Sequence, residues 1–276
     1  MEFLTENEPV IRLAAFISIF ALMAIFEIVV PRRNFAVEPD GSRKVPRWRT
    51  HGLMVVVDSI TLRLIFPAAA VGTALWATES GIGLFNVYDV PIWLAAIIAF
   101  IILDFAVWVE HWASHKFPIL WRIHRMHHSD TEFDVTTALR FHPLEIVLSM
   151  VWKALFVILL GAPVAAVLLF EIVLNGMAMF NHSNVKLPLW LDRLVRQVFV
   201  TPDMHRIHHS SINSETDSNY GFNLAIWDRI FRTYTPEPSL GQEGMEIGLK
   251  SYRGEKPSGL LWCLKLPFKP IAPGGD

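Results

Sequence analysis

The sequence is poor in cysteine and in charge. Only one of its 276 residues is a cysteine, Cys263, which excludes an intramolecular disulfide framework, a multi-cysteine zinc site and a cysteine-held iron–sulfur cluster. Charged residues make up 18% of the chain, against roughly 25% in soluble domains. Because 24 Lys and Arg nearly balance 26 Asp and Glu, the basic footprint of a nucleic-acid-binding protein is also missing.

Long apolar runs take the place of the missing charge. A membrane span needs about 20 mostly apolar residues, and such runs occupy Val10–Val30, Leu53–Ala77 and Val90–Val109. A fourth run, Leu144–Phe180, is too long for one crossing, and Gly161-Ala162-Pro163 breaks it into two helices of a hairpin. The sequence therefore predicts an all-α, multi-pass membrane protein with four to five membrane-embedded helices.

The distribution of basic residues predicts how these helices are oriented. Residues 78–89 contain no Lys or Arg, whereas the first connection contains six: Arg32, Arg33, Arg43, Lys44, Arg47 and Arg49. The positive-inside rule places that connection in the cytoplasm. All histidine clusters then fall on the cytoplasmic side, in a helical cap. We expect a bacterial inner-membrane protein, although the endoplasmic reticulum fits the same physics.

Eleven histidines are the unusual feature of the composition. Eight of them form one HxxxH box and two HxxHH boxes, namely His111 and His115, then His124, His127 and His128, then His205, His208 and His209. Residues i, i+3 and i+4 share one face of a helix, so each box aims its imidazoles in one direction. Eight imidazoles exceed what one ion needs, which predicts two metal ions close together. We expect the isolated His51 to be structural.

Several further residues are candidates for the site. His182 and His142 lie at the edges of the apolar hairpin, where a buried imidazole must find a partner. We expect His182 to be a ligand, and His142 to be either a ligand or a hydrogen-bonded structural residue. Asp104 lies in an apolar helix, where an ionisable group is costly and by default functional. With Asn181, beside His182, Asp104 and His142 form the candidate catalytic set.

The metal and its chemistry are not selected by the histidines alone. Imidazole suits zinc, copper, iron and nickel. A membrane zinc hydrolase is disfavoured because no HExxH motif, which supplies a carboxylate base, occurs. A metal transporter is disfavoured because all three boxes follow span ends on one predicted side. Carboxylates that could fix the imidazole tautomers are Asp104, Asp130, Asp134 and Asp203.

From about Ile98 to Tyr234 the sequence resembles the fatty acid hydroxylase and sterol desaturase superfamily of integral-membrane oxygenases. The resemblance rests on the three boxes, on Arg140-Phe141-His142-Pro143, on Asn181-His182, and on the stretch from Asn219-Tyr220-Gly221 through Trp227-Asp228-Arg229 to Thr233-Tyr234. It implies a non-haem di-iron centre, with zinc as a possible substitute, held by the eight box histidines and His182. Some members carry a further histidine four residues before His182, where this chain has Ala178.

The resemblance also implies the reaction and the partners. The centre would use O₂ to hydroxylate an unactivated C–H bond of a membrane lipid, and desaturation is the alternative. Candidate substrates are a fatty acyl or hydroxy-acyl lipid, an ornithine lipid, an alkyl ether lipid, and a sterol or carotenoid. The chain has no GxGxxG fingerprint and no haem domain, so a separate electron donor is expected, either a ferredoxin, a cytochrome or a flavin reductase.

We expect one membrane-embedded domain over residues 1–276. Residues 1–90 would form N-terminal transmembrane helices, residues 91–235 the histidine-box core, and residues 236–276 an interfacial tail.

Overall fold

The computed structural model describes residues 7–34, 44–67, 69–253 and 256–271. Seven helices make up a long bundle with its connections: α2 (Glu8–Val29), α3 (Lys44–Ile65), α4 (Ala69–Glu79), the short α5 (Leu84–Val87), α6 (Ile92–Lys116), α8 (Pro143–Leu160) and α9 (Val164–Asn181). The predicted all-α architecture is confirmed. By length and composition, five stretches of the described residues could cross a membrane: Glu8–Val29, Val45–Val87, Ile92–Lys116, Pro143–Leu160 and Val164–Asn181.

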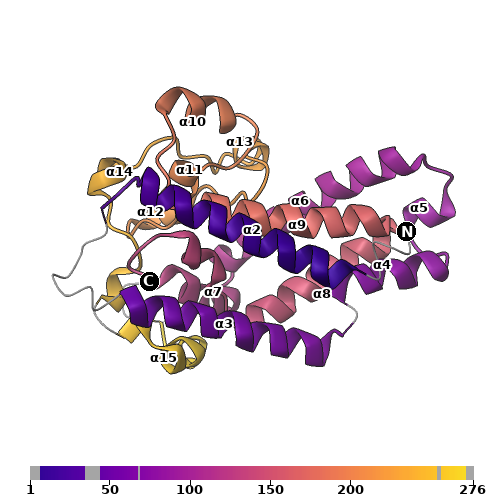
Figure 1. The fold of residues 1–276 in the computed structure, drawn as a ribbon, viewed down its shortest axis with the longest axis horizontal. Coiled ribbons are helices and arrows are strands. Elements are labelled where there is room, and N and C mark those ends of the chain that lie inside the picture. Colours follow the sequence, from indigo (N-terminus) through magenta and orange to yellow (C-terminus); the bar gives the residue numbers. More distant parts are fainter. Residues whose placement is uncertain (1–6, 35–43, 68, 254–255, 272–276) are drawn as a thin grey trace.

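The remaining elements gather at one end of the bundle and form what we call the cap (Figure 1). They are α7 (Pro118–His128), η1 (Val135–Leu139), α10 (Leu189–Val195), α11 (Pro202–His208), α12 (Asn213–Thr216), α13 (Ile226–Ile230), α14 (Gly241–Gly244), η2 (Lys250–Tyr252), η3 (Lys256–Ser258), α15 (Leu260–Lys265) and η4 (Leu266–Phe268). Three isolated β-bridges also occur: Pro31 with Val185, Phe199 with Leu224, and Ser210 with Ile247.

The bundle core lies where α4, α6, α8 and α9 meet. Small side chains such as Ala70, Ala74 and Ala99 alternate there with Val157 and Phe170, and all five are buried. Small residues let helix backbones approach closely, which is how helices associate in a lipid environment. The cluster joins the middle of α6 to α4 and to the α8–α9 turn, at the side of the bundle away from the cap.

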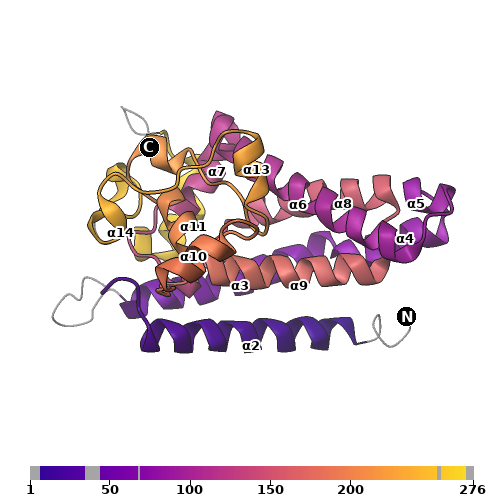
Figure 2. The ribbon, with the colours of Figure 1, turned by 90° about the horizontal axis from the view of Figure 1, so that it is seen from above.

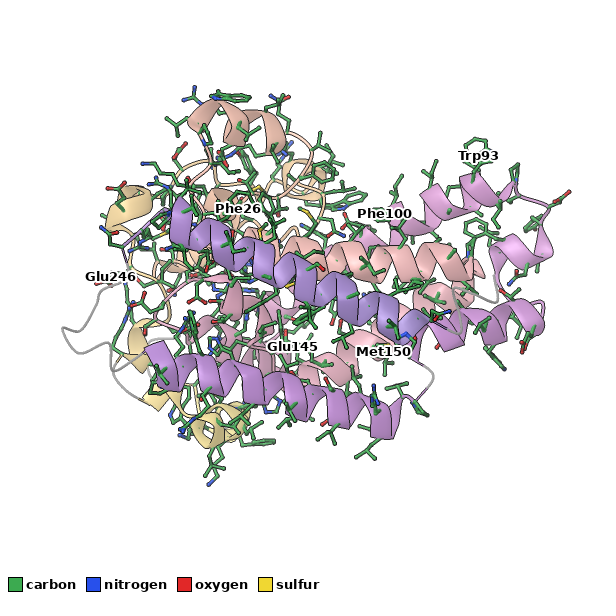
Figure 3. The ribbon with its side chains drawn as sticks, in the orientation of Figure 1. Phe26, Trp93, Phe100, Glu145, Met150 and Glu246 are labelled. Carbon is green, nitrogen blue, oxygen red and sulfur yellow. The ribbon has the colours of Figure 1, made fainter. Side chains whose placement is uncertain are left out.

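The outer helices keep their apolar side chains exposed. Helix α2 forms a separate layer beside α9 (Figure 2) and contains no buried residue. Its Leu13, Ile17 and Ile28 are 59%, 56% and 82% exposed, and Trp93 projects outward at the end remote from the cap (Figure 3). A soluble protein rarely exposes such a surface, so these faces are suited to lipid.

The predicted break of the fourth run is confirmed at Gly161, which ends α8 in the left-handed region with φ of 61°. The break also permits a close contact, since a Cβ on Gly83 would lie 2.1 Å from the backbone nitrogen of Gly161. The second run, predicted as one helix over Leu53–Ala77, is instead two helices. Pro67 lies between α3 and α4. It explains the break in the helix, because proline lacks an N–H and clashes with the preceding turn.

The third run is also longer than predicted. Helix α6 continues without a break to Lys116, so His111 and His115 lie within a candidate span and not after its end. Uninterrupted helix-forming residues from Val107 to Ser114 explain the extension, and Pro118 forces the chain to start a new helix, α7.

The C-terminal segment, expected to be interfacial, packs against α3 and α7. Cys263 and Leu266 are buried with Met54 and Met126, and the Arg125 guanidinium donates to the carbonyl oxygen of Leu266. Leu261 remains 64% exposed. This segment therefore covers the cap end of α3 from one side.

Candidate metal centre

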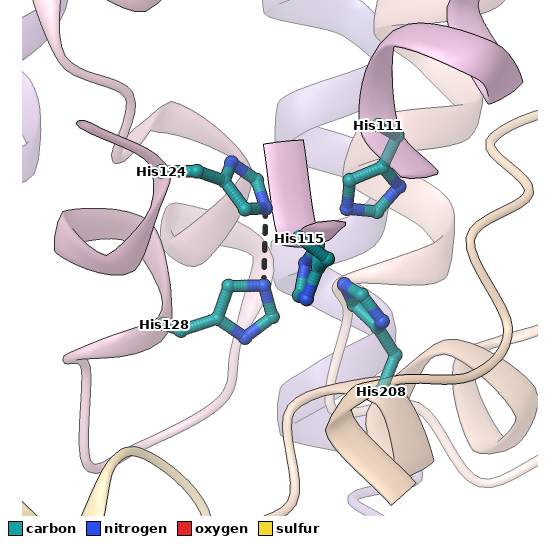
Figure 4. A group of neighbouring side chains, drawn as sticks. All are labelled: His111, His115, His124, His128 and His208. Carbon is teal, nitrogen blue, oxygen red and sulfur yellow. Dashed lines mark hydrogen bonds between the residues drawn. The ribbon is translucent and has the colours of Figure 1, made fainter. Parts of the chain in front are cut away.

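Nine histidines converge where the cap meets the bundle, and they separate into two groups. The potential ligand atoms within each group lie within 4.8 Å of one another. Two ligand nitrogens on opposite sides of one ion stand about 4.2 Å apart, twice a metal–imidazole bond of about 2.1 Å. Each group therefore has the dimensions of one metal site. The five-histidine group is His111, His115, His124, His128 and His208 (Figure 4), and the four-histidine group is His127, His182, His205 and His209.

The two HxxHH boxes contribute to these groups in opposite ways. In the first box, the i and i+4 residues, His124 and His128, belong to the five-histidine group, while the i+3 residue, His127, belongs to the other. In the second box the i+3 residue, His208, belongs to the five-histidine group instead. Each group thus receives an i, i+4 pair from one box and a single imidazole from the other.

Local sequence explains why the boxes are helical at these positions. Pro118 occupies the first turn of α7, where its missing N–H has no partner to lose. In α11, Pro202 has the same position, and the Thr201 side chain caps the helix by accepting from the Met204 N–H. Both short helices therefore begin at a defined residue, which fixes the direction in which each box points.

Hydrogen bonds determine the tautomers of five of the imidazoles. The Nδ1 atoms of His111, His127, His182 and His208 lie 2.7–3.1 Å from the carbonyl oxygens of Tyr220, Arg140, Ala178 and Ser218, and His124 Nδ1 lies 2.6 Å from Glu145 Oε1. An oxygen acceptor requires Nδ1 to carry the proton. The Nε2 lone pair of each ring is then free to bind a metal.

These lone pairs face one another without a proton between them. His127 Nε2 and His182 Nε2 are 3.1 Å apart, although the proton of each ring is on Nδ1. Within the described residues, Nε2 of His111, His115 and His208 and both ring nitrogens of His209 have no hydrogen-bond partner. Buried acceptors that face each other are unfavourable unless a cation lies between them. The residues present therefore fit a pair of bound metal ions.

The imidazoles of the cap are held in their neutral form. Burial, reinforced by the neighbouring imidazoles, lowers the pKa of His127, His128, His205, His208 and His209 well below the ordinary value. Burial also lowers the pKa of His182, to about 4. Since only neutral imidazole binds a metal, these ligands need no deprotonation near neutral pH.

The other candidate residues lie outside both groups. His142 caps α8: its Nδ1 accepts from the Leu144 N–H at 3.1 Å, and its Nε2 donates to the Leu264 carbonyl at 3.2 Å. Asn181 donates to the Phe222 carbonyl, and Asp104 accepts from Trp227 Nε1 at 2.7 Å. His51 donates to Thr136 and accepts from Arg140, in agreement with its expected structural role.

The sequence did not point to the residues that position the ligands. Among the described residues, Glu145 accepts a hydrogen bond from a candidate ligand imidazole, and none of the four expected aspartates does. Asp228 accepts from the Tyr220 and Gly221 N–H groups and thereby fixes the loop whose Tyr220 carbonyl orients His111. Asp228 belongs to the Trp227-Asp228-Arg229 motif, but its spacing from the histidines gave no indication that it acts on one of them.

Two further positioning residues could have been found from the sequence, because an arginine follows the first histidine of each HxxHH box. Both side chains are fully buried. Arg125 donates to the Lys269 carbonyl at 2.6 Å, and Arg206 donates to Gln242 Oε1 at 3.0 Å. Each arginine thus connects its box to a cap segment distant in sequence.

One cavity reaches the five-histidine group from the bundle, and a second cavity lies beside the first. The first, of about 280 Å³, lies among α3, α6, α8 and α9 and reaches His111 and His124. Phe141, whose ring stacks on His127 with centroids 4.5 Å apart, also lines it. The second, of about 290 Å³, has mostly apolar walls from α6, α7 and α8. Glu110, Ser114 and Glu145 line both cavities, so the two spaces are neighbours beside the metal centre.

Comparison with known proteins agrees with this geometry. The family model for fatty acid hydroxylase matches residues 96–233, a range that contains all nine histidines. The chain is 29% identical to the ornithine lipid hydroxylase OlsE of Rhizobium tropici over 92% of this chain and 74% of that protein. No solved structure gives a significant match.

Other relatives match about half of the chain. The chain is 30% identical to human alkylglycerol monooxygenase and 32% identical to the Danio rerio protein of the same name. These matches cover 50% and 51% of this chain and 30% of either relative.

Proposed function

Because the chain belongs to the fatty acid hydroxylase family, as the sequence resemblance predicted, we propose that it hydroxylates an unactivated C–H bond of an amino-acid-containing membrane lipid at a di-iron centre. The observation that carries this proposal is the division of nine buried imidazoles into two groups of ion-binding size. When bound, the two irons supply the activation of O₂ and the oxidant that no side chain provides.

The protein's residues hold and shield this centre. The backbone carbonyls and Glu145 keep the protons of five rings on Nδ1, so that Nε2 faces inward. Phe141 covers one face of His127 and forms part of the cavity wall. A lipid that enters from the bilayer can place its reacting carbon beside His111 and His124 while the buried surroundings exclude bulk water.

The relatives support the choice of substrate. An ornithine lipid hydroxylase matches 92% of the chain, whereas human alkylglycerol monooxygenase matches 50% of it. The N-terminal helix α3 contributes Val55, Asp58 and Leu62 to the first cavity. A match over 92% of the chain includes α3, so the cavity residues that α3 contributes lie within the part of the chain that resembles the ornithine lipid hydroxylase.

The charge distribution supports a cytoplasmic cap. Arg32 and Arg33 follow α2, and Arg47 and Arg49 lie in the first turns of α3, all at the cap end, while residues 78–89 lie at the opposite end (Figure 1). Arg43, also counted for this prediction, lies outside the described residues. On this placement the protein lies in a bacterial inner membrane, and a separate ferredoxin, cytochrome or flavin reductase delivers electrons at the cap.

Metal content and product analysis test the proposal. The protein, purified in detergent from iron-supplemented cells, is expected to contain about two coupled irons per chain by Mössbauer spectroscopy, as two imidazole groups require. His127→Ala and His208→Ala each remove one ligand of a different group and should each reduce the iron content. Lipids of expressing cells should gain the mass of one oxygen atom, whereas desaturation would remove two hydrogens.

His142→Asn is the matched control, because it replaces a buried histidine outside both groups and keeps a cap for α8. It should retain the wild-type iron content. Zinc as the only metal under iron-replete conditions, or iron unaffected by the two ligand variants, would contradict the proposed centre.

A further inference from the structure

The first cavity has an acidic wall in a region where an alkyl chain alone would need only apolar side chains. Three carboxylates line it, namely Asp58 from α3, Glu110 from α6 and Glu145 from α8, together with one ammonium group, that of Lys153. The cavity lies inside the bundle near the cap, where Figure 3 shows Glu145. Carboxylates are costly within a membrane-embedded bundle unless they have a partner or a function.

The carboxyl groups in this wall differ in the hydrogen-bond partners that the protein gives them. Glu145 accepts from His124, and Glu110 accepts from Ser149 at 3.1 Å. The Lys153 ammonium lies 3.5 Å from Glu171, a carboxylate that does not line the cavity. Asp58 is only 8% exposed, and its Oδ1 has no hydrogen-bond partner among the described residues. The wall thus presents a buried oxygen without a partner, and three carboxyl groups against one amino group, to whatever fills the cavity.

We propose that Asp58 binds a primary ammonium group of the lipid substrate and so makes the enzyme selective for amine-bearing lipids. This inference rests on the proposed function. An ammonium is compact and offers three donors, so it can pair with Asp58 and still donate to other oxygens of the cavity wall. An anionic headgroup would be repelled by the same wall, and a neutral one would leave Asp58 unpaired. The apolar second cavity, which meets the first at Glu110, Ser114 and Glu145, suits the adjoining aliphatic part of the lipid.

Steady-state kinetics on iron-loaded protein in detergent test this inference. The two substrates are an ornithine lipid and the same lipid with its free amine replaced by a hydroxyl group, which removes the positive charge at nearly the same size. For the wild type, we expect the KM to be about 10- to 100-fold lower for the amine, the range typical of a buried charge pair. Asp58→Asn should raise the KM for the amine by a similar factor, with little change in kcat or iron content.

Asp89→Asn is the matched control, because it makes the same chemical change at an exposed position on the loop before α6. It should leave both KM values at the wild-type level. Equal KM values of the wild type for the two lipids would overturn the inference without any variant, and so would an Asp58→Asn enzyme with an unchanged KM for the amine. Either result would leave the proposed hydroxylation standing, whereas iron-loaded wild type that oxidises neither lipid would overturn both.

Discussion

Asp228 offers a test of whether a remote loop orients a metal ligand. Its buried carboxylate accepts hydrogen bonds from Tyr220 N at 2.9 Å, Gly221 N at 2.9 Å, Trp108 Nε1 at 3.1 Å and Thr233 Oγ1 at 2.7 Å. The Tyr220 carbonyl in turn accepts the His111 Nδ1 proton at 2.7 Å. Asp228→Asn preserves the shape of the side chain but replaces one acceptor oxygen with a donor.

The size of the effect follows from which oxygen is replaced. Three of the four donors contact Oδ1 and only Gly221 N contacts Oδ2. The amide therefore places its oxygen toward the three donors, and its NH₂ group faces the Gly221 N–H. One buried donor without an acceptor costs about 1–3 kcal/mol of folding free energy. The shifted loop should also weaken metal binding by about 10- to 100-fold, as is typical when the partner of a ligand histidine is disturbed.

Thermal unfolding in detergent and metal titration of the apoprotein measure the two effects. We expect a lower Tm and weaker binding of one metal equivalent, with the other equivalent little changed because His111 belongs to the five-histidine group alone. Glu237→Gln, at an exposed acid in the same cap region, is the control for loss of charge. If Asp228→Asn bound both equivalents as tightly as the wild type, the argument that this loop orients His111 would be refuted.

Two further predictions concern stability. Arg47 binds the buried carboxylates of Asp130 and Asp134 and, against the opposing effect of burial, holds the pKa of both below its ordinary value; Arg47→Leu should cost about 3–5 kcal/mol. The stability from this pairing is present above the ordinary aspartate pKa of about 3.9 and is lost as the pH falls below it, so wild type and variant should converge in Tm at acidic pH. Gly83→Ala should lower the Tm strongly, because the added Cβ would overlap the backbone of the α8–α9 turn. Gly81→Ala is the control: Gly81 also has a positive φ but faces open space, so this variant should lose only about 1–2 kcal/mol of folding free energy. Equal losses of stability in the two variants would show that the close contact is unimportant.

Local chain physics made most of the fold predictable. The break at Gly161 was visible because glycine and proline stand together, whereas Pro67 was hidden within one continuous apolar run, and hydropathy does not distinguish a long helix from two short ones. The extension of α6 past Val109 was missed because the apolar run ends there, whereas the helix continues through polar residues to Lys116. Helical spacing alone indicated the eight box histidines, since i, i+3 and i+4 share a face in any helix.

The supporting residues of the site could not be found in this way. Glu145 is 21 residues from His124, and the two meet only because α8 packs beside α6 and α7. Likewise, the carbonyl that orients His111 comes from Tyr220, 109 residues away. These contacts depend on tertiary packing, and a backbone carbonyl leaves no trace in residue type.

The division into five and four ligands reveals how the centre and the cavity are related. Together, the two HxxHH boxes contribute three imidazoles to each group. The difference between five and four therefore comes entirely from the bundle helices. Helix α6 supplies an i, i+4 pair, His111 and His115, to one group, while α9 supplies only His182 to the other. The position one turn before His182 is Ala178, and Ala178 lines the same cavity that reaches His111 and His124. The cavity wall therefore reaches the residue whose carbonyl orients His182, so the space proposed for the substrate extends to within one helical turn of the smaller group.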